Sequence, residues 1–211
     1  MISVLSDMMS YTFIVRAMIV GGLVALCSAL LGVSLVLKRY SMIGDGLSHV
    51  AFAALTIAVA MNVAPLYIST PIVTVAAIIL LRLSENSKIK GDSAIALIST
   101  VSIAIGVVVT ALTKGMNTDV YSYMFGSILA MSESDVYMSI ALSVVVIILF
   151  VFFYNKIFAV TFDESFAKAT GTKADAYNMI IAVLTAITIV VGMRIMGTML
   201  ISSLIIFPAL I

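Results

Sequence analysis

The sequence predicts an all-α protein, a polytopic transmembrane helical bundle of about seven spans that forms one domain over residues 1–211. Hydrophobic residues make up 63% of the chain and charged residues only 10%, with a mean hydropathy of +1.27, whereas a soluble domain carries about 25% charged residues. Several long stretches contain no Asp, Glu, Lys or Arg. The net charge of +1 indicates no basic surface, so no nucleic-acid partner is expected.

The spans follow from the length of helix that crosses a bilayer, about 20 apolar residues. The uncharged stretch 47–81 is too long for one span, and it forms two if the first begins near Gly44 and the second reaches Arg82. The resulting predicted spans are 13–37, 44–63, 65–82, 93–113, 136–155, 176–193 and 195–211.

The basic residues indicate the orientation of this bundle in the membrane. The loops at 38–43, 82–92 and 156–175 fall on one side of the predicted bundle, and they carry eight of the 11 Lys and Arg residues. Cytoplasmic loops of membrane proteins are enriched in these residues. We therefore expect these three loops to be cytoplasmic and the N-terminus to lie outside.

A carboxylate and the chain's single histidine fall at the start of the second predicted span. Asp45 and His49 are four residues apart, so on a helix they share one face, with their Cβ atoms about 5–6 Å apart. Ionisable groups at membrane depth usually face a bundle interior or an ion path, and carboxylate and imidazole ligands suit divalent transition metals. The pair predicts a metal-contact site, and the alternative is a helix-capping Asp45 beside a hydrogen-bonded structural His49.

The loop 161–171 carries the signals of a short helix. Thr161 and Glu164 fit a capping box, in which each side chain accepts from the other residue's backbone N–H. Asp163 and Glu164 suit the positive end of the helix dipole, and Gly171 suits the position after the last turn, where φ is positive. About ten residues are too few to span the membrane.

One face of this short helix is apolar, since Phe162, Phe166 and Ala169 are spaced at i, i+4 and i+7. The helix can therefore either lie flat in the headgroup layer or dock its apolar face into a groove on a cytoplasmic partner. The sequence contains no GxxxxGKS/T phosphate-binding motif, so any nucleotide hydrolysis must come from another chain.

On the opposite side of the predicted bundle, the run 120–130 lies between acidic residues and is too short to cross the membrane. We expect a short interfacial or re-entrant helix there, with Tyr121 and Tyr123 at headgroup level. The alternative is a simple aromatic anchor.

Taken in order, these elements resemble the membrane permease subunits of bacterial ABC importers for zinc, manganese or iron. The most specific match is the run Gly-Asp-Gly-Leu-Ser-His at 44–49, within a similar stretch at 37–51. Three further stretches carry the resemblance: 124–130, 163–171 and 191–201, the last leading into the Ile-Ile-Phe-Pro-Ala element at 205–209.

The resemblance implies a transporter subunit that is not itself an enzyme and that binds no cofactor of its own. Two copies would pair as a homodimer around a central path in the bacterial cytoplasmic membrane, surrounded by lipid. Two cytoplasmic ATP-binding subunits would hydrolyse ATP, and a periplasmic or extracellular metal-binding protein would deliver the ion. By this resemblance the transported divalent ion is zinc, manganese or iron.

The resemblance also implies roles for individual residues. Asp45 and His49 match the family's metal contacts. The residues expected to couple the chain to the ATPase are Phe162, Asp163, Glu164, Phe166, Ala167, Ala169 and Gly171. Structural or gating roles are expected for Gly44, Gly46, Gly126 and Pro208.

Members of the family continue past the Pro-Ala element with further spans, whereas this sequence stops at Ile211, so we expect a C-terminally truncated chain. Two other functions are compatible with the residues alone. One is an ion-coupled secondary carrier in which Asp45 and His49 relay protons. The other is a membrane sensor or assembly protein that carries no ion flux.

Overall fold

The computed structural model describes residues 10–38, 40–86, 91–113, 125–127 and 132–210. Helices and no strands make up the regular structure of these residues, which confirms the predicted all-α class. The elements in chain order are α2 (Thr12–Leu37), α3 (Ser41–Ala60), α4 (Pro65–Asn86), α5 (Gly91–Leu112), α7 (Glu133–Phe152), α8 (Tyr154–Phe162), α9 (Glu164–Ala169), α10 (Ala174–Ile206) and the 3-10 helix η2 (Phe207–Ala209).

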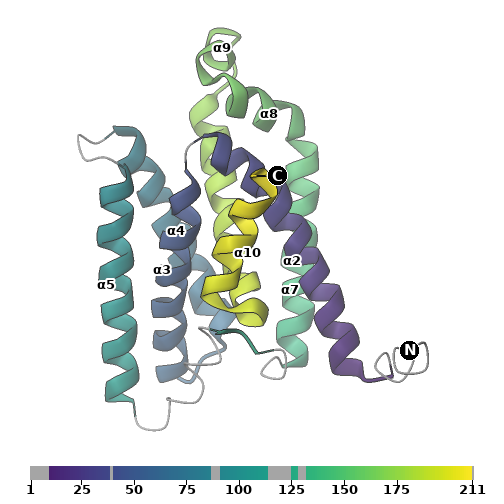
Figure 1. Cartoon of the computed structure of the whole chain (residues 1–211), viewed down its shortest axis with the longest axis vertical. Coiled ribbons are helices and arrows are strands. Elements are labelled where there is room, and N and C mark those ends of the chain that lie inside the picture. The colour runs from purple at the N-terminus through teal and green to yellow at the C-terminus, as the bar shows by residue number, and fades with distance from the viewer. Residues whose placement is uncertain (1–9, 39, 87–90, 114–124, 128–131, 211) are drawn as a thin grey trace.

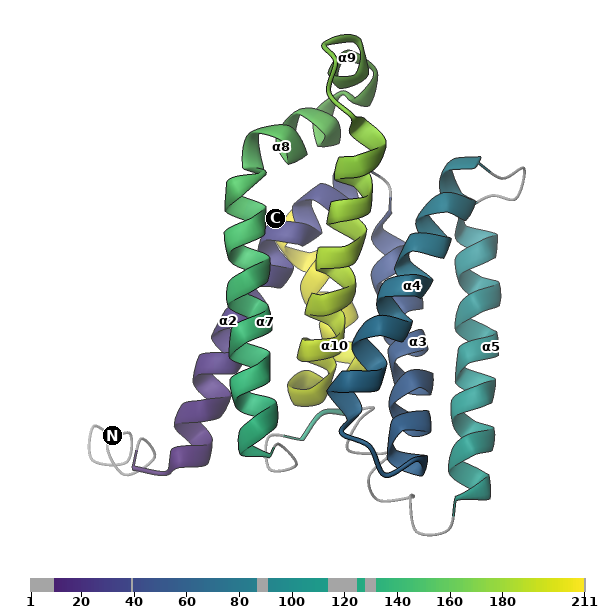
Figure 2. The same cartoon turned by 180° about the vertical axis from the view of Figure 1, so that it is seen from behind.

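The long helices run side by side and alternate in direction (Figures 1 and 2). α2 rises to the end of the bundle at which α8 and α9 lie, and we call this end the α9 end. α3 descends from there, α4 returns, α5 descends again and α7 rises to meet α8. The junction between α2 and α3 therefore lies at the α9 end, together with the start of α10.

Six helices among the described residues are long and apolar enough to cross a membrane: α2, α3, α4, α5, α7 and α10. A helix satisfies its own backbone N–H and C=O groups, which is the requirement for crossing lipid. The chain is accordingly a multi-pass membrane protein, and its first five long helices lie close to the first five predicted spans.

α10 differs from the other spans because it reverses at Gly197, whose φ of 81° and ψ of 167° are not helical. The first arm, 174–196, descends from the α9 end, and the second arm, 198–206, turns back toward it (Figure 1). The predicted spans 176–193 and 195–211 fall on these two arms. A nine-residue helix rises only about 14 Å, so the reversal makes the second arm shorter than the span expected there.

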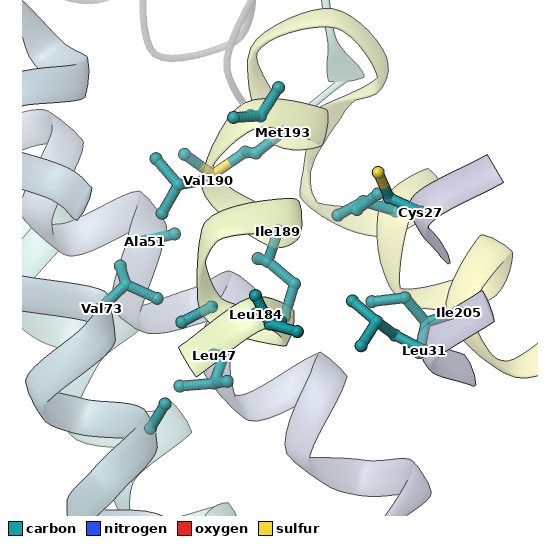
Figure 3. Packing of buried hydrophobic residues seen from close by; sticks show 14 of the residues in the cluster. Cys27, Leu31, Leu47, Ala51, Val73, Leu184, Ile189, Val190, Met193 and Ile205 are labelled. Atoms are coloured by element: carbon teal, nitrogen blue, oxygen red, sulfur yellow. The ribbon is translucent and has the colours of Figure 1, made fainter. Parts of the chain in front are cut away.

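The first arm of α10 forms the centre of the bundle. Its residues are buried on nearly all sides, and an apolar character around the whole circumference is what an enclosed helix requires. Figure 3 shows Leu184, Ile189 and Met193 of this arm within the hydrophobic cluster. Leu47 of α3 and Leu31 of α2 belong to the same cluster on either side of the arm.

The second arm of α10 packs closely on α2. A Cβ built on Gly32 of α2 would lie 1.9 Å from the backbone O of Ile205 and 2.9 Å from its carbonyl C. Small residues allow helix backbones to approach in this way inside a membrane. The side chain of Ile205 is fully buried, so the arm cannot move away without opening a cavity in the core.

We expect Gly32→Ala to destabilise the folded chain, because the new methyl group must displace the backbone of the second arm. Overpacking of this kind costs about 1–3 kcal/mol. The measurement is the midpoint of thermal unfolding in detergent. Gly22→Ala is the matched control, since a Cβ on Gly22 of the same helix meets no atom within 4 Å, and equal midpoints for the two variants would contradict the close approach.

Candidate functional site

The Asp45–His49 pair lies at the start of α3. The helix begins at Ser41, so both residues fall in its first turns and share one face, as their spacing predicts. The His49 Nε2 and Asp45 Oδ2 atoms are 3.6 Å apart, which is too long for a direct hydrogen bond. The two side chains are 28% and 43% exposed respectively, so the described part of the chain does not enclose them.

The separation of the two groups suits ligands of one ion. Two ligand atoms that each lie about 2.1 Å from a tetrahedral ion are roughly 3.4 Å apart, close to the 3.6 Å between Nε2 and Oδ2. Over the described ranges, no group of three or more His, Cys, Asp or Glu side chains is placed to hold a metal ion. The pair therefore offers two protein ligands, and water or a second chain would supply the others.

Buried hydroxyl groups lie beside this pair, and the sequence reasoning did not single them out. Ser48 is fully buried, and its Oγ donates to the backbone O of Asp45 at 2.7 Å. Ser202, on the second arm of α10, lies 3.2 Å from Ser48, Oγ to Oγ. The reversal at Gly197 thus brings a distant polar residue to this turn of α3, and no local pattern around Ser202 could have indicated it.

Gly44 and Gly46 flank Asp45, and both lie within α3. A Cβ on Gly46 would lie 2.7 Å from the Cγ2 atom of Ile95 on α5, whereas a Cβ on Gly44 would meet Ile205 Cδ1 at an ordinary 3.6 Å. Gly46 therefore allows α3 and α5 to pack closely. The structural or gating roles expected of these glycines stay predictions, and the contacts observed are those of helix packing.

The segment 161–171 forms the end of α8 and all of α9. The predicted capping box is wrong, because the N-cap of α9 is Asp163, whose side chain accepts from the Phe166 N–H at 2.9 Å. Thr161 instead belongs to α8. The backbone leaves the helical conformation only at Asp163, with φ −146° and ψ 93°, and an aspartate at that position caps a helix as well as a threonine does.

The predicted helix end at Gly171 is confirmed by its φ of 82°. The Gly171 N–H donates to Lys168 O at 3.0 Å, and the Thr172 N–H donates to Ala167 O at 2.9 Å. These two bonds form the Schellman pattern, which closes a helix around a residue with positive φ. α9 is thus a short helix that is capped at both ends.

The apolar face predicted for this segment is uncovered in the chain. Phe162 and Phe166 are 63% and 65% exposed, and Ala169 is exposed as well. Ala167, in contrast, is buried in a small cluster with Val160 and Ala174, so it belongs to the inner face of α9. Large apolar side chains left open outside the spans are typical of an interaction surface.

Glu164 lies on the inner face of α9 and joins several charged and polar groups. Its Oε2 accepts from Lys38 Nζ at 3.0 Å and from Asn178 Nδ2 at 3.2 Å, while its Oε1 pairs with Lys168 Nζ at 2.9 Å. Lys168 also pairs with Asp175 at 3.1 Å. We refer to these five residues as the Glu164 network.

The surroundings of Glu164 favour its ionised form. Burial by itself would raise the pKa of Glu164, but hydrogen bonds from Lys168, Lys38 and Asn178 outweigh it and lower the pKa from 4.5 to about 2. Hydrogen bonds to Glu164 and Asp175 raise the pKa of Lys168 above its ordinary range. Each charge thus stabilises the ionised form of its neighbour.

At the other end of the bundle, Gly126 contacts the reversal of α10. It has a φ of 80°, and a Cβ there would lie 2.4 Å from Ile195 O and 2.5 Å from Met196 C. Both the backbone conformation and the lack of space favour glycine. Apart from 125–127, the predicted interfacial or re-entrant helix at 120–130 lies outside the described residues.

A buried ion pair lies near this reversal. Arg194, in the last turn before Gly197, donates to the carboxylate of Asp135 at the start of α7. Asp135 also forms a capping box with Ser132, since the backbone N–H of each residue donates to the other's side chain at 3.2 Å. One carboxylate thus caps α7 and neutralises a buried guanidinium, as buried charges require.

Pro208 lies in η2, which continues the second arm of α10. Proline suits the first positions of a helix because its missing N–H has no partner there. η2 packs against α2. The structural or gating role expected of Pro208 stays a prediction.

Comparison with known proteins extends over nearly the whole chain. Residues 10–211 match the ABC 3 transport family. A "Probable metal transport system membrane protein" of Treponema pallidum (strain Nichols) is 32% identical over 202 residues, which cover 95% of this chain and 75% of that protein. The "Manganese transport system membrane protein MntC" of Halalkalibacterium halodurans is 26% identical over 203 residues, covering 96% and 69%.

Two further similarities concern a zinc protein and a solved structure. The "High-affinity zinc uptake system membrane protein ZnuB" of Haemophilus influenzae is 29% identical over 195 residues, covering 92% of this chain and 74% of that protein. The structure "PsaBC from Streptococcus pneumoniae in complex with Fab" contains a chain with a TM-score of 0.85 and 27% identity. The similarity covers 98% of this chain and 74% of that one.

We expect the stability that the Glu164 network supplies to depend on pH. A carboxyl whose pKa is lowered by folding stabilises the protein above its ordinary pKa and loses that effect as the pH falls through the lowered value. Wild type should therefore unfold at a higher temperature than Glu164→Gln at neutral pH. The difference should shrink as the pH falls from 4.5 to about 2.

The measurement is the thermal midpoint of both proteins in detergent between pH 7 and pH 2. Glu133→Gln is the control at neutral pH, because it removes the carboxylate of an exposed pair with Arg16, and such pairs contribute about 0–1 kcal/mol. A difference between wild type and Glu164→Gln that stayed constant down to pH 2 would contradict the lowered pKa of Glu164.

Proposed function

Since the chain belongs to the ABC 3 transport family, we propose that it is the membrane permease subunit of an ATP-driven importer of a divalent metal ion. The chain is a transporter component and is expected to catalyse no reaction itself. The observation that carries the proposal is the combination of two features at the α9 end. These are the Asp45–His49 pair on α3 and a capped short helix with exposed phenylalanines.

The class of ion follows from the ligands and from the relatives. Carboxylate oxygen and imidazole nitrogen both bind borderline divalent metals. The relatives of this chain are named for manganese and zinc transport, and we propose zinc, manganese or iron(II) as the cargo. Two protein ligands are fewer than the four of a structural zinc site, which suits a position that the ion occupies briefly and leaves.

The proposed importer contains two copies of this chain around a central path. The incomplete cover of Asp45 and His49 in one copy supports this arrangement, because ionisable groups at membrane depth face a bundle interior or a cavity. Pairing would place two carboxylates and two imidazoles along one path. A metal-binding protein outside the cell membrane would load that path.

We place the α9 end on the cytoplasmic side of the bacterial cell membrane and the N-terminus outside. The lysines at 38, 168 and 173 support this orientation. They lie at the end of α2, in α9 and at the start of α10, all at the α9 end, and basic residues are enriched in cytoplasmic loops. In this orientation α9 faces the compartment that contains ATP. The exposed Phe162 and Phe166 side chains would then dock into a groove of the ATP-binding subunit.

We expect Asp45→Ala and His49→Ala each to lower ATP-dependent metal uptake by at least about tenfold, because even the loss of a residue that only supports a metal ligand costs about 10–100-fold. The measurement is uptake of zinc and manganese into vesicles that contain the permease, its ATP-binding subunit and its metal-binding protein. Glu133→Ala, which removes an exposed carboxylate at the start of α7, is the control. Wild-type uptake in both α3 variants would refute the site assignment.

We expect Phe166→Glu to separate the permease from its ATP-binding subunit, because a charge in an apolar groove weakens docking by at least about 2 kcal/mol, or roughly 30-fold in Kd. Co-purification of the ATP-binding subunit measures the effect. The matched control is Met61→Glu, because Met61 follows α3 outside the spans, at the end of the bundle away from α9, and its 62% exposure is close to the 65% of Phe166. Unchanged co-purification of the Phe166 variant would show that α9 does not bind the ATPase.

A further inference from the structure

The Glu164 network connects three helices at the α9 end. Lys38 directly follows α2, its side chain is only 7% exposed, and its Nζ lies 3.0 Å from Glu164 Oε2. The same Nζ donates to Asn178 Oδ1 of α10, and the Asn178 amide donates to Glu164 at 3.2 Å. α2, α9 and α10 thus meet at three side chains that bond to one another.

The two faces of α9 therefore differ in chemistry. Phe162 and Phe166 are open to a partner, whereas Glu164 contacts other elements of its own chain. All three residues are expected from the sequence to couple the chain to the ATPase, and that expectation stays a prediction. The contacts distinguish an exposed face, with Phe162 and Phe166, from an inner face on which Glu164 bonds to Lys38 and Asn178.

Lys38 also lies just before the helix that carries the candidate metal site. α3 begins three residues later at Ser41, and the Tyr40 N–H donates to Leu35 O at 2.8 Å, which makes the connection tight. Lys38, Tyr40 and Ile43 line a cavity of only about 10 Å³ against α10. A space of this size holds at most about one water molecule, so the side chains of this junction lie directly against α10.

We propose that the contact between Lys38 and Glu164 transmits movement of α9 to the junction of α2 and α3, and so to the start of the helix that bears Asp45 and His49. Lys38 and Glu164 are then positioning residues, which touch neither the ion nor the ATPase. The inference rests on the proposed function, because it needs an ATPase that moves α9. It assigns to Lys38 a role that its place in the sequence does not suggest.

Lys168 provides a matched comparison within the same network. It pairs with the other oxygen of Glu164 at 2.9 Å, so its removal also takes one positive charge from that carboxylate. Lys168, however, lies on α9 itself. Among the described ion pairs, its one partner outside α9 is Asp175, at the start of α10. Loss of Lys168 therefore weakens the network without cutting the link to α2.

The first test compares metal uptake per bound ATPase for Lys38→Met, Lys38→Arg and Lys168→Met. Lys38→Met should lower uptake by about tenfold, within the usual range of coupling between sites, while the ATP-binding subunit still co-purifies. Uptake by Lys168→Met should stay within about twofold of wild type, because the Lys168 side chain is half exposed and exposed ion pairs contribute little. Lys38→Arg keeps the charge and should restore uptake to within about threefold.

The second test measures the accessibility of the first turn of α3 directly, and it needs no metal. Met42 is 48% exposed in the first turn of α3, and Met42→Cys in a Cys27→Ala background gives one thiol for alkylation. Its alkylation rate in the complex with the ATP-binding subunit should differ at least about threefold between the nucleotide-free and the ATP–vanadate states. Lys38→Met should remove this difference, and Lys168→Met should retain it.

The outcomes separate the inference from the proposed function. If wild type shows no ATP-dependent uptake and binds no ATP-binding subunit, the proposed function fails and the transmission role fails with it. If wild type transports but Lys38→Met behaves like Lys168→Met in uptake and alkylation, only the inference is overturned. It is also overturned if nucleotide leaves the alkylation rate of the wild-type network unchanged, or if Lys38→Met releases the ATP-binding subunit.

Discussion

Gly197 turns the chain back on itself, and the arrangement around the candidate site depends on this reversal. After the first arm of α10 has descended through the centre of the bundle, φ of 81° at Gly197 sends the second arm back toward the α9 end. That arm packs Ile205 against Gly32 of α2 and brings Ser202 to Ser48 of α3. A residue with a Cβ would be strained in this conformation. The contact between Ser202 and the start of α3 therefore depends on a glycine at position 197.

Two kinds of ionisable pair can be compared among the described residues. The first kind is hydrogen-bonded. The pair of Asp135 and Arg194 is buried, and the pair of Glu164 and Lys38 is partly buried at the α9 end. These contacts offset the cost of removing charges from water. Asp45 and His49 differ, since their 3.6 Å separation leaves both groups without a direct bond to each other and partly open. The proposed ion-binding role uses this unbonded, partly exposed pair, whereas the bonded pairs connect helices.

Local sequence signals predicted a helix end well where only one residue type can form it. They were less successful where several nearby residues can each cap the helix. Gly171 ends α9 because few other residues adopt positive φ there. The start of α9 was predicted at Thr161, yet Asp163 caps it, because Ser, Thr and Asp cap helices about equally well and tertiary packing chooses between them. The i, i+4 spacing of Asp45 and His49 placed both on one face, since helix geometry alone decides that.

The sequence by itself determined the all-α membrane class and the approximate positions of the long helices, because an uncharged stretch of about 20 residues has only the helix as a way to cross lipid. It also marked Asp45 and His49, because charge is rare at that depth. Tertiary structure alone decided that the last apolar stretch folds back at Gly197, that Ser202 lies beside Ser48, and that Lys38 reaches Glu164. Those contacts join residues over 100 positions apart, and hydropathy and spacing carry no information about which distant side chains meet.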